Sequence, residues 1–425
     1  MTPPAEIDAG ELDLARWIRP GDGVLFSQAC AEPVGLVDRL IEQSAEIGGL
    51  RVFCGLTWRE VLAAPEAASL EVVSYGALGR LSRVAAQRPV RIVPCHFSAL
   101  AGLFAARALP GDVALVQVAP PDAEGRYSLG VDASYLADAV AHARVVIAEV
   151  SDGMPATRGA WLDHAAIDVV VRSSRPLLES PAPPPTETDE GIAERIAALI
   201  EDGDTIQIGV GALPEAILRR LDGANDLGIH SGMIGDAVVD LVEAGVITGA
   251  RKAADRGLIV TGAAIGTQRL FDFLERSEDV LMRPVSYTHD PATLAQVGRL
   301  VAINGGVEVD LTGQVNAEVA GGRHVGAVGG QVDFMRGAVA SGGLGIVALP
   351  SVVAKTGATR IVAELSGPVT TARGDVDLVV TEHGVARLRG LDLEQRAAAL
   401  IAVAAPEHRN ELAQRGAVGP IVNRR

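Results

Sequence analysis

The sequence predicts an α/β protein with two similar domains, each built on a mostly parallel sheet, and three observations lead to this prediction. Runs of β-branched residues at 145–150, 258–261 and 378–381 alternate with segments of helical periodicity, which is typical of βαβ units around a buried parallel sheet. The pattern of the first half recurs in the second half. A segment rich in proline and polar residues, 173–190, separates the two halves.

The recurrence pairs residues 18–40 with residues 200–221. Each copy contains a Gly-Asp turn, an apolar strand, a loop of small residues and an amphipathic helix that begins near a Glu and a Pro. A second recurrence pairs residues 113–130 with residues 303–318. The alternative is that Gly-Asp strand starts recur by chance in α/β proteins, but self-similarity over this length favours two copies of one domain.

We therefore expect an N-terminal domain over residues 1–175, a Pro-rich linker over residues 176–190 and a C-terminal domain over residues 191–425. Ligands of parallel sheets bind beyond the carboxyl ends of the strands. We expect the C-terminal domain to supply most of the chemical groups, because the glycine-rich turns described next lie within it.

Composition and charge exclude several classes of function. A chain of 425 residues with net charge −16 and 3% aromatic residues lacks the basic surface and the stacking platforms that nucleic acids require. Three scattered cysteines, Cys30, Cys54 and Cys95, suit a reducing compartment and neither a disulfide framework nor a spaced zinc site. The N-terminal segment is unlike a signal peptide, and no apolar run reaches about 18 residues free of charge or glycine. We expect a cytoplasmic enzyme with no metal and no membrane partner.

A glycine-rich turn in the second half is the first candidate for a binding element. Residues 206–210 read as a buried strand, and Gly209 and Gly211 let a ligand approach the backbone without a Cβ atom in the way. Pro214 then starts an amphipathic helix whose N–H groups face whatever lies above the turn. Taken alone, the turn is explained more simply as a tight connection between a strand and a helix.

Seven collinear segments carry a resemblance to one family. They are VALVQVAPPDAEGRYSLG (113–130), GVGALPEAIL (209–218), HSGMIGDAVVDLVEAGVITG (230–249), YTHDP (287–291), INGGVEVDLTGQVNAE (303–318), VGGQVDFMRGA (328–338) and VTTARGDVDLVVTEHGVARLRG (369–390). Together they resemble the acetyl-CoA hydrolase/transferase family, in its 4-hydroxybutyrate CoA-transferase-like branch of the family I CoA-transferases.

The resemblance implies tandem CoA-transferase-type halves, with the acyl-CoA site in the C-terminal domain. Coenzyme A is then the cofactor, in the form of an acyl-CoA substrate, and the other partner is a small acceptor. The resemblance also implies a homodimer or a homotetramer. We expect contacts to CoA at Gly209, Val210, Gly211, Ala212, Leu213, Gly306 and Gly329; the alternative for Gly306 is a plain strand terminus.

The position of the expected catalytic carboxylate is occupied by glycine. Family members carry a glutamate in the third place of a His-Ser-Glu-Met segment, and this glutamate forms an acyl-glutamyl anhydride and then a glutamyl-CoA thioester. Here that place is Gly232. His230 ends a strand in our prediction, and either it points toward the site or it packs in the core. His289 and His383 also depart from the asparagine and tyrosine that relatives usually have.

Three further residues are candidates for chemical roles. Gly330 and Gln331, with Gly329, form a turn whose backbone N–H groups would hold a thioester carbonyl as an oxyanion hole does; the alternative is a turn that needs positive φ. Glu318 matches a recurrent family glutamate, and it is either a carboxylate that supports the site or an ordinary exposed one.

Three interpretations of Gly232 follow. In the first, the enzyme keeps the CoA pocket and the oxyanion loop and transfers the acyl group directly to water or another acceptor, which enters the space of the missing side chain. In the second, it is a carboxylate CoA-transferase that uses a displaced carboxylate such as Glu318. In the third, it is a non-catalytic acyl-CoA binder or the partner of an active paralogue.

Overall fold

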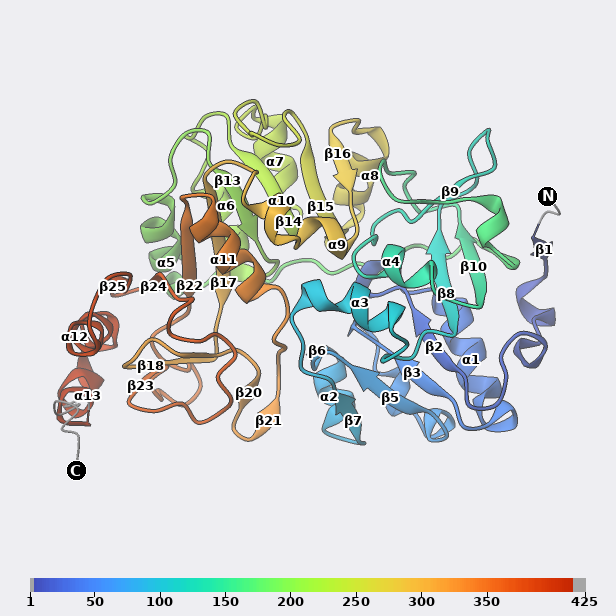
Figure 1. Ribbon diagram of the computed structural model, residues 1–425, viewed down its shortest axis with the longest axis horizontal. Helices are drawn as coiled ribbons and strands as arrows, with labels where there is room; N and C mark the ends of the chain where they lie inside the picture. The colour runs from blue at the N-terminus through green and yellow to red at the C-terminus, as the bar shows by residue number, and fades with distance from the viewer. Residues whose placement is uncertain (1–3, 416–425) are drawn as a thin grey trace. The chain divides into compact units, whose positions relative to one another are not determined.

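Two large sheets organise the chain, and they share one strand order. The computed structural model describes residues 4–415, and Figure 1 colours them along the chain. The first sheet has the order β1-β12-β10-β8-β2-β3-β5-β7, and the second has the order β16-β15-β14-β13-β17-β22-β24-β25. When the outermost strands β1 and β25 are set aside, each sheet has its earliest strand in the middle, the next three on one side and the last three on the other. The predicted α/β class with two mostly parallel sheets is confirmed.

The bounds of the strands are as follows. The first sheet contains β1 (Ala5–Glu6), β2 (Gly23–Phe26), β3 (Arg51–Phe53), β5 (Glu71–Ser74), β7 (Val90–Ile92), β8 (Val113–Val118), β10 (Val145–Ser151) and β12 (Val169–Ser173). The second contains β13 (Thr205–Ile208), β14 (Gly228–Ile234), β15 (Ile259–Ala264), β16 (Val280–Met282), β17 (Leu300–Gly305), β22 (Leu344–Ala348), β24 (Leu378–Thr381) and β25 (Gly384–Arg387). Strands β24 and β25 pair antiparallel, whereas the other neighbours in the second sheet pair in parallel.

Short strands and helices complete the described chain. The short strands are β4 (Leu56–Thr57), β6 (Leu78–Gly79), β9 (Tyr127–Ser128), β11 (Trp161–Leu162), β18 (Glu308–Asp310), β19 (Val315–Asn316), β20 (Val319–Ala320), β21 (Arg323–His324) and β23 (Ile361–Val362). The α-helices are α1 (Val34–Ile47), α2 (Leu81–Ala85), α3 (Leu100–Ala105), α4 (Leu136–Val140), α5 (Glu187–Ala197), α6 (Ala212–Arg219), α7 (Ala237–Glu243), α8 (Gln268–Arg276), α9 (Val285–Thr288), α10 (Pro291–Leu294), α11 (Gln331–Ala340), α12 (Leu393–Val403) and α13 (Arg409–Arg415).

Contacts group the described residues into two compact units. Unit 1 runs to Pro181 and adds His230–Val239 and Leu258–Asp290, so it holds the first sheet, most of β14, and β15 and β16. Unit 2 consists of Ala182–Ile229, Asp240–Gly257 and the residues from Pro291 onward, and it holds β13, β17, β22, β24 and β25. This grouping follows contacts rather than chain order, and the domain boundaries at residues 175 and 190 stay a prediction.

The core of unit 1 explains why its central strands are mostly apolar. Strands β8 and β10 are buried over their whole length, as expected for a parallel sheet that is covered on both faces. Helix α1 buries Leu36, Val37, Leu40 and Ile41 in the same core, a spacing that places these side chains on one face of the helix.

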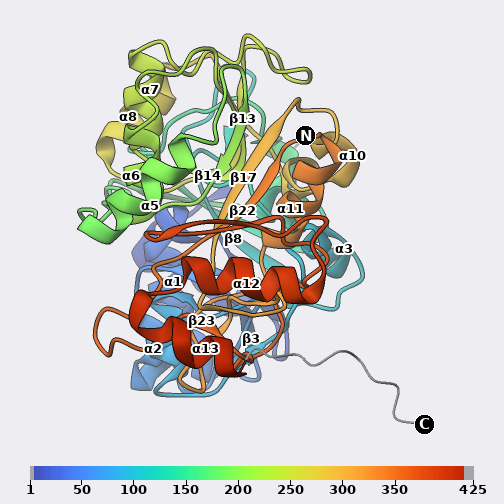
Figure 2. The same ribbon diagram turned by 90° about the vertical axis from the view of Figure 1, so that its left-hand side faces the viewer.

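The C-terminal helices close the core of unit 2. Helix α12 begins with a capping box between Asp392 and Gln395, and it packs against β24, β25 and α13. Figure 2 shows α12 and α13 as successive red helices. Their buried residues Leu400, Val403 and Leu412 belong to one apolar cluster with β22, β24 and the small β18–β23 sheet.

Two local predictions around the glycine-rich turn need correction. Strand β13 ends at Ile208, so Val210 belongs to the turn rather than to the strand. Helix α6 begins at Ala212, and Pro214 is therefore its third residue and not its first. The reason is Gly211, whose φ of +125° changes the chain direction two residues earlier than the proline.

The prediction that His230 ends a strand is also wrong. Strand β14 continues to Ile234, because Met233 and Ile234 extend the apolar run and pair with Ala263 and Ala264 of β15. Gly232 therefore lies inside a strand. Helix α5 begins at Glu187, within the segment predicted as linker, because Thr186 forms a capping box with Asp189.

Candidate functional site

The predicted CoA-binding turn in unit 2 lies at the point where the strand order of its sheet reverses. Strand β13 pairs with β17 on one side, and the next strand of the chain, β14, pairs with it on the other. Ligands of open parallel sheets bind at such switch points. A Cβ atom built on Gly209 or Gly211 would meet no described atom within 4 Å, so the backbone of this turn faces open space. Val210, Ala212 and Leu213 are only partly buried.

At the end of β17, next to this turn, Asn304 pairs with Gln207 of β13, and Gly306 follows in a closely packed position. Asn304 Nδ2 donates a hydrogen bond to Gln207 Oε1 at 2.9 Å, which ties the ends of β17 and β13 together. A Cβ on Gly306 would lie 3.0 Å from Val315 Cγ1, so a larger residue there would displace the start of the small sheet. The contact of Gly306 with CoA stays a prediction, since close packing against Val315 fits either interpretation.

The turn at Gly329-Gly330-Gln331 leads into a helix N-terminus. Gly329 has a φ of +58°, and Gly330 precedes the first residue of α11, Gln331. The buried Nε2 of Gln331 has no hydrogen-bond partner among the described residues. A side-chain donor next to the N–H groups of a helix start suits an oxygen that carries negative charge. These residues can therefore provide the oxyanion stabilisation that the sequence predicts.

Glu318 is buried within a polar network, so its interpretation as an ordinary exposed carboxylate is wrong. The side chain is 5% exposed, and its Oε1 accepts a hydrogen bond from Thr370 Oγ1 at 2.8 Å. Asn316 Oδ1 accepts a bond from Glu318 N at 3.0 Å, while Asn316 Nδ2 donates to Glu308 Oε1 at 3.0 Å. The network fixes the rotamer of Glu318 and its loop.

His230 is a packed residue of β14. It is 0% exposed, and its Nε2 donates to the carbonyl oxygen of Thr288 at 3.1 Å, on α9. His289 is also buried: it lies 2.8 Å from Thr288 Oγ1, and burial together with the charge of His230 lowers its pKa to about 3. His289 is therefore neutral at physiological pH.

Gly232 lies beside Gly262 of β15, which contacts a polar segment of unit 1. Its neighbours Ser231 and Met233 pair with Thr261 and Ala263, which places Gly232 opposite Gly262 of β15. A Cβ on Gly262 would lie 2.9 Å from Gly232 O and 3.5 Å from Ser134 Cα. Residues opposite one another in parallel strands have side chains on the same face of the sheet. Position 232 therefore lies next to Gly262, which itself contacts the Ser134 segment.

The polar segment contains a group that the sequence analysis missed. Asp132 and Ser134 are both buried, and Gln28, which follows β2, donates to each: Gln28 N to Asp132 Oδ2 at 3.1 Å and Gln28 Nε2 to Ser134 Oγ at 3.0 Å. The available signal was the sequence LGVDASYL (129–136), in which an Asp and a Ser two positions apart interrupt an apolar run. Buried polar residues in such a run need partners.

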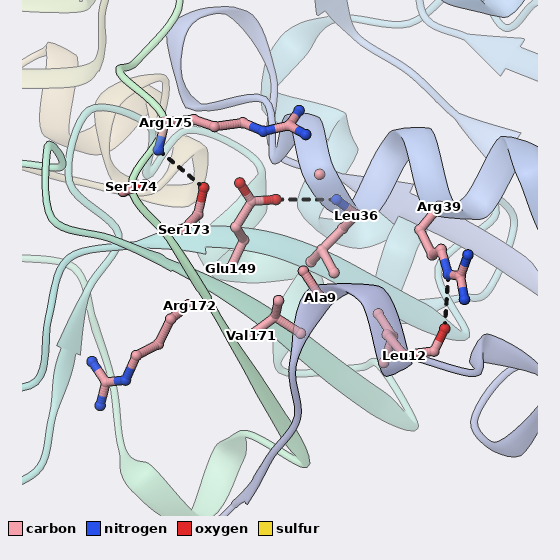
Figure 3. Close-up of a pocket in the computed structure, with 11 residues that line it drawn as sticks. Ala9, Leu12, Leu36, Arg39, Glu149, Val171, Arg172, Ser173, Ser174 and Arg175 are labelled. Carbon is pink, nitrogen blue, oxygen red and sulfur yellow. Dashed lines mark hydrogen bonds between the residues drawn. The ribbon is translucent and has the colours of Figure 1, made fainter.

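A small cavity elsewhere in unit 1 contains a second buried carboxylate (Figure 3). Its volume is about 200 Å³, and Glu149 of β10 and the first turn of α1 line it. Glu149 Oε2 accepts a hydrogen bond from Leu36 N at 3.0 Å, and Figure 3 shows the other oxygen directed away from the helix. Gly35 permits this approach, since a Cβ there would lie 3.0 Å from Glu149 Oε2. The cavity's lining includes no predicted site residue.

Between residues 4 and 415, no group of three or more His, Cys, Asp and Glu side chains is arranged to hold a metal ion. Over the same residues, no helix combines the length and the apolar character that a membrane crossing requires.

Known proteins share this fold and much of this sequence. Residues 9–174 match the acetyl-CoA hydrolase/transferase N-terminal domain, and residues 266–416 match the C-terminal domain of the same family. The chain is 40% identical over 413 residues to 4-hydroxybutyrate coenzyme A transferase of Clostridium kluyveri, with 92% of each chain covered. It is 32% identical to succinyl-CoA:cyclohexane-1-carboxylate CoA transferase of Geobacter metallireducens, covering 95% of this chain and 93% of the relative. The crystal structure of RipA from Yersinia pestis superposes with a TM-score of 0.89 at 33% identity, covering 97% and 96%.

The fold and these matches define an enzyme of the acyl-CoA transferase and hydrolase class. The chain belongs to the acetyl-CoA hydrolase/transferase family.

Proposed function

We propose that the enzyme moves an acyl group from CoA to water or another acceptor without forming a glutamyl-CoA intermediate. The observation that carries the proposal is Gly232: the place of the expected nucleophilic glutamate lies inside β14 and has no side chain. Its neighbours do not replace it. His230 is buried against α9, and Asp236, which follows β14, accepts hydrogen bonds from Thr267 N and Oγ1.

The remaining parts of an acyl-CoA site support this proposal. The turn from Gly209 to Leu213 and the glycines Gly306 and Gly329 would contact CoA through the backbone. Gly330 N–H and the Gln331 side chain would donate to the thioester oxygen, which gains negative charge as the acceptor attacks the carbonyl carbon. The carbon–sulfur bond then breaks, the acyl group stays on the acceptor and CoA leaves as the thiol.

A carboxylate CoA-transferase is the second candidate, and the names of the relatives favour it. The relative at 40% identity is called a CoA transferase, as is the one at 32%. Such chemistry requires a carboxylate in place of the absent one, and Glu318 is the candidate in unit 2. The third candidate is an acyl-CoA binder without catalysis.

We further propose a cytoplasmic homodimer or homotetramer with no nucleic acid, membrane or metal partner. This proposal rests on the acidic charge, the scattered cysteines and the family. Size-exclusion chromatography with light scattering measures the mass of the assembly directly.

The products of acyl-CoA turnover separate the three functions. The protein is incubated with acyl-CoAs of several chain lengths, with and without carboxylate acceptors. We expect free thiol and no new CoA thioester, measured with a thiol-reactive dye and by chromatography. A new thioester would favour the transferase. The absence of both free thiol and new thioester would favour the binder.

Intact-mass measurement after rapid quenching should show unmodified protein, because Gly232 offers no nucleophile. A mass gain at Glu318 would instead identify the displaced carboxylate.

Gly330→Val should abolish measurable acyl-CoA binding while the fold stays intact. Valine tolerates the backbone at this position, where φ is −91°, but its branched side chain would cover the backbone that a thioester approaches. Calorimetry with an acyl-CoA measures the loss. Gly223→Val is the matched control, since a Cβ on that glycine would meet no described atom within 4 Å and the residue lies beyond the end of α6. Unchanged affinity in the Gly330 variant would show that the pocket lies elsewhere.

A further inference from the structure

Glu149 occupies a position of β10 that the pattern of the strand assigns to the core. Alternate residues of a strand share one face of the sheet. Val145 and Ile147, which precede Glu149 in this alternation, both belong to the apolar cluster that includes the buried residues of α1. Glu149 is itself 1% exposed. Burying a charge is costly unless the charge is paired, so the partners of this carboxylate decide its role.

The carboxylate of Glu149 is only partly satisfied. Its Oε2 accepts a hydrogen bond from Leu36 N at the start of α1, where the helix N-terminus stabilises a negative charge. Its buried Oε1 has no hydrogen-bond partner, and Glu149 forms no ion pair, within residues 4–415. A carboxylate offers about four acceptor positions, and only one of them is used here. The charge is therefore fixed in place, with positions left for a further donor.

A residue on the neighbouring strand also lacks a donor. Gln117 of β8 lies opposite Glu149 in the pairing of β8 with β10, so both side chains lie on the same face of the sheet. Gln117 is buried, and its Oε1 has no hydrogen-bond partner among the described residues. In this arrangement two buried acceptor oxygens on adjacent strands are without a donor, which is rare in folded proteins.

The cavity in Figure 3 gives a small molecule access to Glu149. Its inner lining includes the buried side chains of Leu36 and Val171, and its rim includes the exposed residues Ala9 and Ser174. Its volume is about 200 Å³. Because an apolar cavity of about 150 Å³ holds benzene, this one has room for roughly six to eight non-hydrogen atoms. The apolar part of the lining favours an organic molecule over a hydrated metal ion.

The charges around the cavity favour a cation. Each of the three arginines in the lining has a carboxylate partner outside it: Arg39 pairs with Glu42 at 3.0 Å, Arg172 with Glu6 at 2.6 Å and Arg175 with Asp38 at 3.5 Å. These carboxylates balance the arginine charges, whereas the charge of Glu149 has no counterpart among the described residues. A positively charged donor is the group that would balance it.

We infer that this cavity binds a small primary ammonium compound. The ammonium group would donate to the carboxylate of Glu149, and a short apolar chain would lie against Leu36 and Val171. The whole site belongs to unit 1, and it contains none of the residues proposed to contact CoA. The inference is therefore independent of the proposed function.

Isobutylammonium is the probe for this site, because it joins a primary ammonium group to a short branched chain. Isobutanol has the same shape without the charge, and potassium chloride supplies a cation without the chain. Saturation-transfer NMR at neutral pH detects binding, and a titration gives the dissociation constant. The wild-type protein should bind isobutylammonium with a Kd on the order of 1 mM. It should bind isobutanol at least about tenfold more weakly, and potassium should not displace the amine.

Two variants test the placement of the ligand. Glu149→Gln should weaken amine binding by about tenfold or more, because the amide keeps an acceptor for Leu36 N but has no charge. Ala9→Leu should also weaken binding, because the larger side chain obstructs the rim, and it leaves Glu149 unchanged. Ala9 is exposed, so this variant should fold even if Glu149→Gln does not.

Asp132→Asn is the matched control. It neutralises another buried carboxylate of unit 1, but both oxygens of Asp132 already have donors, Ser134 Oγ and Gln28 N. This variant should bind isobutylammonium with the affinity of the wild-type protein.

Loss of amine affinity in Glu149→Gln and Ala9→Leu, with wild-type affinity in Asp132→Asn, supports the site. Equal binding of isobutanol and isobutylammonium, or displacement of the amine by potassium, overturns the inference of an ammonium ligand. Absence of amine binding by the wild-type protein also overturns it and leaves the proposed function standing. The missing donor would then be Nε2 of Gln117, turned toward Glu149 by rotation of its amide.

Discussion

Gly232→Glu is expected to give the protein carboxylate-dependent CoA exchange, which the wild-type chain should lack. The new side chain would lie inside β14, opposite Gly262, which has no side chain to oppose it. Exchange between an acyl-CoA and labelled acetate or propionate measures the gain. Activity should be weak, because such a carboxylate must be placed within about half an ångström.

Gly232→Gln is the control for this variant, since it has the same size and no nucleophile. A rise in exchange for glutamate but not for glutamine would show that the transferase site is otherwise preserved. If acyl-CoA still binds and neither variant exchanges CoA, the acceptor pocket has been rebuilt for another reaction. The transferase interpretation would then be untenable.

Asp132→Asn is expected to change how stability depends on pH. Burial raises the folded-state pKa of Asp132 to about 7, whereas the unfolded chain ionises near the ordinary value of about 4. This carboxyl therefore contributes its full stability below pH 4 and loses it as pH rises to 7. Between pH 5 and pH 8 the loss is on the order of 3 kcal/mol, at 1.36 kcal/mol per pH unit. Asparagine removes this term while keeping an acceptor for Gln28 N.

Urea denaturation of both proteins at pH 5 and pH 8 checks the prediction. The stability of the variant relative to wild type should increase by about 3 kcal/mol from the lower to the higher pH. Other titrating groups cancel in this difference because both proteins share them. An equal pH dependence would mean that Asp132 ionises normally in the folded state.

The architecture was predictable because it depends on features that a sequence displays directly. Residues 145–148 and 378–380 are apolar without interruption, and such runs are typical of a parallel sheet that is covered on both faces. The paired segments 18–40 and 200–221 became β2 with α1 and β13 with α6, at matching places in the two sheets. Local periodicity and repetition were sufficient for this part.

The site was less predictable because it depends on side-chain direction and on segments far apart in the chain. Glu318 could not be assigned as buried until its partner Thr370 was placed beside it. Position 232 could be named from the resemblance, but its place within β14 required the pairing with β15. Asp132 belongs to no local sequence motif, because its hydrogen-bond partner Gln28 lies 104 residues away in the chain.

The common strand order of the two sheets has a consequence for the history of the chain. Each sheet has its own switch point, so the same arrangement of strand ends is present twice. After β13, the chain presents bare backbone at Gly209 and Gly211. After β2, it presents the amide of Gln28, which holds an acid and a hydroxyl. The two equivalent strand ends therefore differ: one leaves its backbone open, and the other is filled by a buried, hydrogen-bonded acid and hydroxyl.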